Sequence, residues 1–317
     1  MRKLFILVFA IFIAGCSGGK GKSDYEGPYI SDYFPVHKNT SMFYESPTLP
    51  ALNQMMFISY TDGGKFQRVI LFNEIAQTEV FENKNGELRL INSEQQVYAP
   101  EKMTANEPRL DILVLKEPLV VGATWDSSNG AASEITAMDV PVRVPYGEFE
   151  AMEVATVDKQ GRGNVMYYAK GVGLIKVVYV DPNSGRDYTA ELSEVRENVG
   201  LNLGFGVYDI DDEGIDFSVT NKSISFPTDG DMLAFLNEAV KLVDGEGILD
   251  GEIKSITTDR DAESMTVDLS RGFSGSSTKE GVLNCLAQTI GRFYEIKNVS
   301  FTENGKKTGN AEVYYAY

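Results

Sequence analysis

The sequence predicts a mixed fold, in which an antiparallel β domain spans residues 29–200 and a small α+β domain spans residues 201–317. Short runs of alternating apolar and polar residues, separated by turn-forming residues, fill the chain from Tyr29 to Arg196. Apolar residues at helical spacing recur only later, in two stretches beyond residue 227. Hydrophobic residues make up 43% of the chain and aromatic residues 11%, which is enough for a packed core.

The β domain is expected to begin with two hairpins. Residues 55–60 and 66–72 flank a loop with Gly63 and Gly64, and residues 79–82 and 88–91 flank a loop that ends at Gly86. Further strands are predicted at residues 112–115, 140–144, 149–157, 165–169 and 174–180. Gly161 and Gly163 indicate a hairpin turn, and Gly171 and Gly173 allow a bulge or a positive φ. We expect no helix of ten residues in this domain.

The α+β domain is expected to follow the order β-β-α-β-β-α-β, with two helices on one sheet. Residues 201–206 suit a linker or a crossing strand, and residues 207–210 and 223–226 suit strands. Thr228 and Asp231 resemble a capping box at the start of the first helix, which runs through apolar residues to Gly245.

The second half of this domain is predicted in the same way. Strands are expected at residues 253–257 and 265–269, and Ser277 with Glu280 forms a fuller capping box before the second helix. Its apolar face consists of Val282, Leu283, Leu286, Ile290 and Phe293, bordered by Cys285 and Thr289. A strand at 299–302, a turn at Asn304-Gly305 and a strand-like tail at 312–317 complete the domain.

The first fifteen residues have the features of an export signal. Arg2 and Lys3 precede an apolar run at residues 4–13, which is too short to span a bilayer. The next residues, 13–16, end at Cys16 and resemble the lipobox of bacterial lipoproteins. That resemblance implies cleavage before Cys16, a diacylglycerol on its thiol and often an acyl chain on its new amino group. The alternative is an ordinary secretory signal beside a chance cysteine.

The residues after the signal and the charge of the chain indicate where the protein acts. Residues 16–28 begin with small and polar residues and are expected to form a flexible tether. The net charge is −17, from 29 Lys plus Arg against 46 Asp plus Glu, and becomes −19 (27 against 46) without Arg2 and Lys3. An acidic surface repels nucleic acid and anionic lipid headgroups, so the membrane is expected to be reached through the covalent lipid. The predicted location is extracytoplasmic, on the outer membrane if the host has two, because Ser17 follows Cys16.

The residues that could carry chemistry favour a protein without enzymatic activity. His37 is the only histidine, so triads and multi-histidine metal sites lack their partners, and no catalytic, cofactor or metal residue is assigned. Residues 209–214 open like a calcium loop, but its twelfth place is Thr220 rather than Glu, so an acidic turn is favoured. Cys285 is interpreted as a small buried residue, with a reactive thiol as the alternative. The tyrosines of 314–317 suit an edge strand more than a contact patch.

The C-terminal sequence resembles the GerMN domain, which is named for a spore-germination lipoprotein. The resemblance rests on residues 229–239 of the first helix, the strand 265–273, the helix 286–293 and the closing strand and turn 297–306. It implies an α+β module without enzymatic activity that acts by protein contact outside the membrane, in sporulation, germination or other envelope processes. No functional residue is carried over, because the motif consists of core and turn positions such as Val267, Leu269 and Phe273.

The N-terminal sequence resembles a β-rich domain of exported lipoproteins. The matching segments, in order, are residues 32–35, 121–125, 144–151 and 167–176. This resemblance implies an architecture and no activity.

We therefore expect an envelope lipoprotein that acts as a protein-interaction or assembly module, with envelope proteins and a second copy of the chain as candidate partners. The alternative is a lipoprotein that holds an apolar or glycan ligand in its β domain with aromatic residues such as Trp125. A deep apolar cavity would favour the ligand-binding protein, and a filled core would favour the interaction module.

Overall fold

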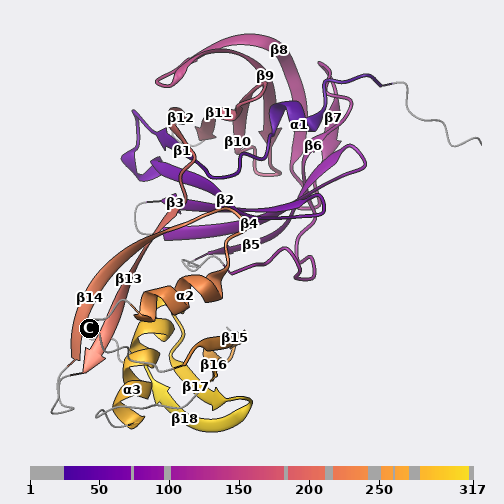
Figure 1. Cartoon of the computed structure of the whole chain (residues 1–317). Helices are drawn as coiled ribbons and strands as arrows, with labels where there is room; N and C mark the ends of the chain where they lie inside the picture. Colours follow the sequence, from indigo (N-terminus) through magenta and orange to yellow (C-terminus); the bar gives the residue numbers. More distant parts are fainter. Residues whose placement is uncertain are drawn as a thin grey trace, which may run out of the picture.

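The protein is described here from a computed structural model of the chain. The described residues are 25–72, 75–95, 101–181, 185–210, 217–241, 251–259, 261–270 and 279–313. Two parts follow one another along the chain: a large sheet, and a smaller part with helices that begins with a long two-stranded ribbon (Figure 1).

The first part is one antiparallel sheet, which has twelve strands within the described residues. Strands β1 and β12 pair with each other, so the first and last strands of the part join its two halves in the order β6-β5-β4-β3-β2-β1-β12-β11-β10-β9-β8-β7. The strands are β1 (Thr40–Glu45), β2 (Gln54–Asp62), β3 (Lys65–Phe72), β4 (Ile75–Lys84), β5 (Glu87–Gln95), β6 (Ile112–Lys116), β7 (Thr124–Asp126), β8 (Ala132–Val144), β9 (Gly147–Val157), β10 (Gly163–Ala169), β11 (Gly173–Asp181) and β12 (Arg186–Glu197).

Both predicted hairpins are confirmed. Asp62 pairs with Lys65 across the loop Gly63-Gly64, and Lys84 pairs with Glu87 across Asn85-Gly86. All four loop residues have positive φ (54°, 94°, 55° and 74°), as a two-residue turn that matches the strand twist requires. The strands predicted between 112 and 180 lie within β6 and β8 to β11, and the helices described in this part, α1 (Ile30–Tyr33) and η1 (Pro50–Leu52), are short as expected.

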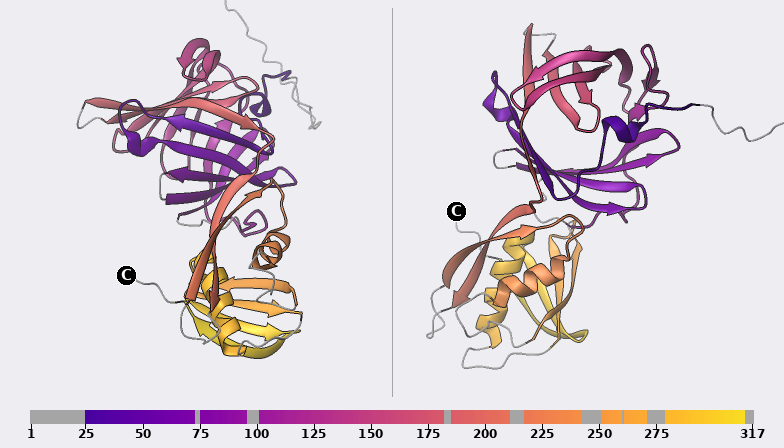
Figure 2. Two further views of the ribbon diagram at one scale, coloured as in Figure 1. Left: turned by 60° about the vertical axis from the view of Figure 1, so that its left-hand side comes forward. Right: turned by 45° about the horizontal axis from the view of Figure 1, so that its top comes forward.

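The sheet curls until its two edge strands, β6 and β7, lie beside each other (Figure 2). Trp125 Nε1 and Ser127 Oγ both donate hydrogen bonds to the backbone carbonyl of Leu113 on β6, at 3.3 and 2.7 Å. Strands β6 and β7 are not paired by backbone hydrogen bonds. Side-chain hydrogen bonds therefore join them, and we call this contact the seam.

The second part begins with the ribbon β13 (Leu201–Ile210) and β14 (Phe217–Phe226) and continues with a separate sheet. Its order along the chain is α2 (Met232–Lys241), β15 (Ile253–Asp259), β16 (Ser264–Leu269), α3 (Lys279–Leu286), a π-helical turn η2 (Ala287–Gly291), α4 (Arg292–Tyr294), β17 (Asn298–Glu303) and β18 (Lys306–Glu312). Strands β16 and β17 are parallel, and the sheet order is β15-β16-β17-β18. Helix α3 contacts both β13 and β18, so it lies between ribbon and sheet.

Residues 201–206, for which a linker or a crossing strand is predicted, are part of a strand. The arrangement differs from the predicted β-β-α-β-β-α-β order in two ways. The first two strands form their own ribbon rather than joining the sheet. An extra strand, β18, precedes the predicted tail strand, of which only Glu312 lies in β18 and residues 314–317 are outside the described residues. Residues 201–206 look irregular in the sequence because Gly204 and Gly206 interrupt the apolar alternation, whereas Leu201, Leu203 and Phe205 are all buried.

The predicted core positions of the second helix are confirmed. Val282, Leu283, Leu286, Ile290 and Phe293 are all buried, and Cys285 is 1% exposed. The same apolar cluster takes in Phe57, Tyr60 and Val69 from strands β2 and β3 of the large sheet. The two parts therefore share one buried core at their junction.

Candidate functional site

Several of the sequence predictions fall on residues outside the described ranges, among them the capping residue Ser277 and the helix end at Gly245. Cys16, the predicted lipidation site, lies outside the described residues, which begin at Tyr25. Of the acidic turn at residues 209–214, only the backbone of Asp209 and Ile210 is described, as the end of β13. Among the described residues, no helix has the length and apolar character to cross a membrane. The same residues contain no cluster of His, Cys, Asp and Glu side chains suited to a metal ion.

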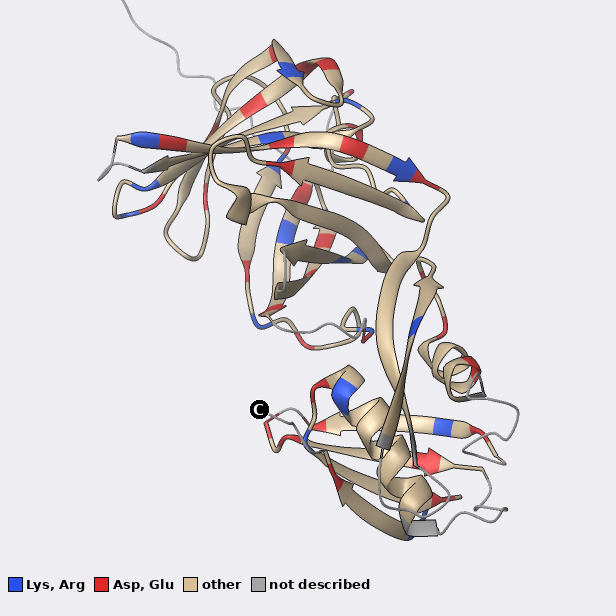
Figure 3. Ribbon diagram, turned by 90° about the vertical axis from the view of Figure 1, so that its left-hand side faces the viewer, with Lys and Arg blue, Asp and Glu red and all other residues tan. Residues whose placement is uncertain are grey.

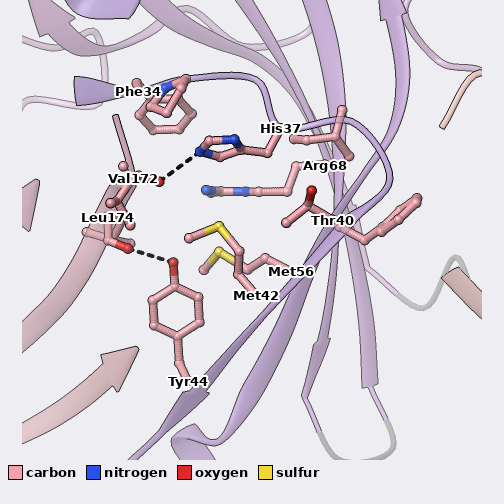
Figure 4. Close-up of a pocket in the computed structure, with 13 residues that line it drawn as sticks. Phe34, His37, Thr40, Met42, Tyr44, Met56, Arg68, Val172 and Leu174 are labelled. Atoms are coloured by element: carbon pink, nitrogen blue, oxygen red, sulfur yellow. Dashed lines mark hydrogen bonds between the residues drawn. The ribbon is translucent and has the colours of Figure 1, made fainter. Parts of the chain in front are cut away.

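A small pocket lies inside the curled sheet, next to the segment that follows α1. His37, Arg68 and Tyr44 point into it from three different elements, with the sulfur atoms of Met42 and Met56 beside them (Figure 4). Arg68 lies on β3 between Phe66 and Ile70, which belong to two separate apolar clusters. The pocket therefore occupies the space between these clusters.

The guanidinium group of Arg68 forms an ion pair within the protein. Its Nε and Nη2 atoms donate to Glu79 Oε2, at 3.1 and 2.5 Å, and the two side chains are only 15% and 10% exposed. The guanidinium carbon lies 4.8 Å from the ring centroid of Phe81 and 5.8 Å from that of Phe34. Glu79 also accepts a hydrogen bond from Gln77 Nε2 at 2.8 Å. The positive charge of Arg68 is therefore balanced by Glu79 inside the sheet.

The other polar groups of the pocket also have internal partners. The Tyr44 hydroxyl donates to the carbonyl of Leu174 at 2.7 Å, and His37 Nε2 lies 3.2 Å from the carbonyl of Val172. Burial raises the pKa of Tyr44, and the nearby charge of Arg68 only partly offsets this effect, so the phenol stays neutral. Burial likewise raises the pKa of Tyr168, and the charge of Arg68 again opposes this effect.

The pocket has a volume of about 50 Å³. That volume admits a few water molecules, each of which needs roughly 10–15 Å³ on this measure, and excludes an acyl chain or a sugar. The pocket therefore serves the packing of the sheet better than it serves ligand binding.

Trp125, the aromatic residue predicted for ligand contact, has a structural role. It is 5% exposed, packs in the cluster of Leu113, Leu115 and Ile135, and does not line the pocket of Arg68. Its indole N–H bonds across the seam between β6 and β7. The sequence could not reveal this role, because the seam brings together strands that are not neighbours in the sheet.

Thr228 and Asp229 fasten the second part of the protein to the large sheet. Thr228 Oγ1 accepts from the backbone N–H of Asn39 at 2.8 Å and donates to the carbonyl of Ile58 at 2.7 Å, while Asn39 Oδ1 accepts from the N–H of Thr228 at 2.8 Å. The predicted capping role of Thr228 is therefore wrong. Asp231 is the residue before the helix, and its Oδ1 accepts from the N–H groups of Leu233 and Ala234, which is the bonding of an N-cap.

Asp229 adds an ion pair to this junction. Its carboxylate accepts from Lys38 Nζ at 2.7 Å and from the N–H and Oγ1 of Thr61, at 2.6 and 2.8 Å. Partial burial would raise the pKa of Asp229, but the hydrogen bonds from Lys38 and Thr61 outweigh it and hold the pKa below its ordinary value. The junction thus combines apolar packing with hydrogen bonds and an ion pair. These contacts hold the end of the ribbon against β2.

Three residues of the GerMN-like segment 265–273 have core or turn positions in the structure. Val267 and Leu269 are buried, and Phe273 lies outside the described residues. Asp268 Oδ1 accepts from Thr302 Oγ1 at 2.6 Å and from the N–H of Gly305 at 2.8 Å, so it holds the turn between β17 and β18. These hydrogen bonds lower the pKa of Asp268.

Comparisons with known proteins identify no family. No family model matches the chain, and neither does any curated protein. Among solved structures, the chain is similar to a protein of Bacteroides fragilis described as exported, with a YmcC-like fold (9% identity, TM-score 0.33, 52% of this chain and 99% of that chain). It is also similar to a protein of Parabacteroides distasonis described as a lipoprotein (14% identity, TM-score 0.29, 52% of this chain and 98% of that chain). These TM-scores are too low to establish a common fold.

Proposed function

We propose that the chain is an extracytoplasmic lipoprotein, anchored through Cys16, that acts by binding other envelope proteins and not by catalysis. The anchor is supported by residues 1–16, which combine a positive end, a short apolar run and a lipobox-like cysteine. Two or three acyl chains would hold the protein at the membrane stably, whereas one chain would hold it only marginally.

The observation that carries the second half of the proposal is the small size of the pocket inside the large sheet. Arg68 pairs with Glu79, and the Tyr44 hydroxyl and His37 Nε2 lie within hydrogen-bond distance of backbone carbonyls. The pocket that these side chains line has a volume of about 50 Å³. An interior of this kind supports an interaction module rather than the alternative, a carrier of an apolar or glycan ligand. A link to sporulation or germination is a narrower proposal and rests on the GerMN resemblance of residues 229–306 alone.

Crosslinking in the host tests this function. The lipidated protein, crosslinked in intact cells and purified, should bring down defined envelope proteins at a constant ratio, and a Cys16→Ser form should lose most of them because it leaves the membrane. Recovery of no specific envelope protein with the native chain would contradict the proposal. Recovery of a second copy of this chain alone would point to self-association instead.

A further inference from the structure

Among the described residues, no strand pairs with the outer edge of β13 from Leu201 to Gly206. Within the described residues, β13 is hydrogen bonded to β14 on one side only, and the pairing runs without a register shift from Leu201 with Phe226 to Ile210 with Phe217. The backbone N–H of Tyr208 donates to Thr289 Oγ1, at 2.9 Å, and so points away from β14. Because backbone direction alternates along a regular strand, the N–H and C=O groups of Asn202, Gly204 and Gly206 point away from β14 as well.

These three residues line a groove between the ribbon and the helical segments η2 and α4. The groove has a volume of about 410 Å³ and is lined by the edge itself and by side chains that include Leu71, Phe293 and Arg292. Its size lies in the range of ligand clefts, roughly 300–1,000 Å³. Arg292 stacks on Tyr208, with 5.0 Å between the guanidinium carbon and the ring centroid.

The edge lacks the features that usually protect an exposed strand. Residues 201–208 of β13 carry no charged side chain, whereas β14 carries Lys222, and the ribbon is mostly uncharged (Figure 3). Natural edges are commonly guarded by a charge, a proline or a bulge, and β13 has none of these from Leu201 to Tyr208. Gly204 has no atom within 4 Å of the place where a Cβ would lie, so its surroundings are open.

We propose that the β13 edge from Asn202 to Gly206 binds an extended peptide segment of a partner protein, which adds a strand to the ribbon. This inference rests on the proposed function and names the kind of partner and the surface. Alternating N–H donors and C=O acceptors are complementary to another strand, and the apolar lining gives room for alternate side chains of that strand. Because the mature protein carries a net charge of −19 (27 Lys plus Arg against 46 Asp plus Glu), the partner segment should be uncharged at its centre and basic rather than acidic at its ends.

A matched pair of proline variants tests the edge. Gly204 and Ser223 face each other in the ribbon, and both point their N–H groups outward, away from the ladder that joins β13 to β14. Gly204→Pro therefore removes one donor from the proposed edge, and Ser223→Pro removes one from the opposite edge. Proline is tolerated at such outward positions because no ladder bond is lost.

The probe is a library of random peptides displayed on phage and selected against the purified full-length protein. We expect selected peptides to bind Ser223→Pro within about twofold of the native affinity and Gly204→Pro at least about tenfold more weakly. We also expect them to protect the amides of Gly204 and Gly206 from hydrogen exchange. Failure to select any peptide, or selected peptides that bind Gly204→Pro as well as the native protein, would overturn the inference.

A second measurement does not depend on the folding of the variants. Selected peptides methylated at alternate backbone nitrogens should fall into two sets, one that no longer binds because its missing N–H faced β13, and one that still binds. Equal binding of both sets would also reject strand addition. In cells, crosslinks that persist in the Gly204→Pro strain would refute the β13 edge while leaving the proposed function in place, whereas a native protein without crosslinks would refute the function itself.

Discussion

At the scale of single residues, the structure gives Arg68, Glu79 and Thr228 internal hydrogen-bond partners. Arg68 and Glu79 form an ion pair inside the sheet, and Thr228 is bonded on both sides at the junction. The capping box predicted at Thr228 failed because Thr and Asp both cap helices well, and local sequence does not tell which of them begins the helix. Only the tertiary contact with Asn39 and Ile58 decides it.

The ion pair gives the first prediction. Arg68→Met should lower the free energy of unfolding by about 3 kcal/mol, because it leaves Glu79 without its guanidinium partner in a mostly buried place. The double variant Arg68→Met/Glu79→Met should recover most of that loss. Denaturant unfolding measures both. Arg143→Met, which breaks the exposed pair of Arg143 with Glu148, is the control and should change stability by less than about 1 kcal/mol. A double variant less stable than the single one would contradict this account.

Asp229 predicts a dependence on pH. Its folded-state pKa is lowered, so its ionised form stabilises the protein above the unfolded-state pKa, about 3.9, and this contribution is lost as the pH falls through the folded-state value. Asp229→Asn should therefore be less stable than the native protein at neutral pH, and the difference should shrink toward pH ~2. Unfolding curves at a series of pH values measure this, with Asp261→Asn on an exposed turn for comparison. A difference that stays constant across the series would rule out the assigned role.

At the scale of elements, turn chemistry made the hairpins predictable and apolar spacing made the helices predictable. The two-residue loops at Gly63-Gly64 and Asn85-Gly86 adopt the positive φ values that these residues allow. Strand β18 was missed because Lys306, Lys307, Asn310 and Glu312 give it a polar sequence, which an edge strand with one solvent face tolerates. The more apolar residues that follow it drew the prediction toward the tail.

The seam between β6 and β7 gives a prediction at this scale. Trp125→Phe and Ser127→Ala each remove one donor to the carbonyl of Leu113 and should each cost about 1 kcal/mol. Together they remove both donors, and the double variant should lose more than the sum of the single losses. Thermal unfolding followed by circular dichroism measures the three values. Faster hydrogen exchange in β6 should accompany the double variant, and strictly additive losses would argue against a shared carbonyl.

At the scale of the whole molecule, the sequence indicated a β-rich first part and a mixed second part, and the structure has both. The relation between them could not be predicted. Phe57, Tyr60 and Val69 of the large sheet belong to the core of the second part, and this sharing depends on which face of β2 and β3 is turned outward. A two-part body with a common core presents its surfaces, including the β13 edge, in a fixed arrangement, which suits a module that acts by contact.

The central claim is that lipid on Cys16 holds this body at a membrane facing outward. The most direct test is growth of the host with radiolabelled palmitate, followed by cell fractionation, for the native chain, Cys16→Ser and Cys285→Ser. Cys285 is the only other cysteine and is buried, so its variant is the matched control. We expect label and membrane association for the native chain and for Cys285→Ser, and neither for Cys16→Ser. A native chain that takes up no label and fractionates with the cytosol would contradict the account.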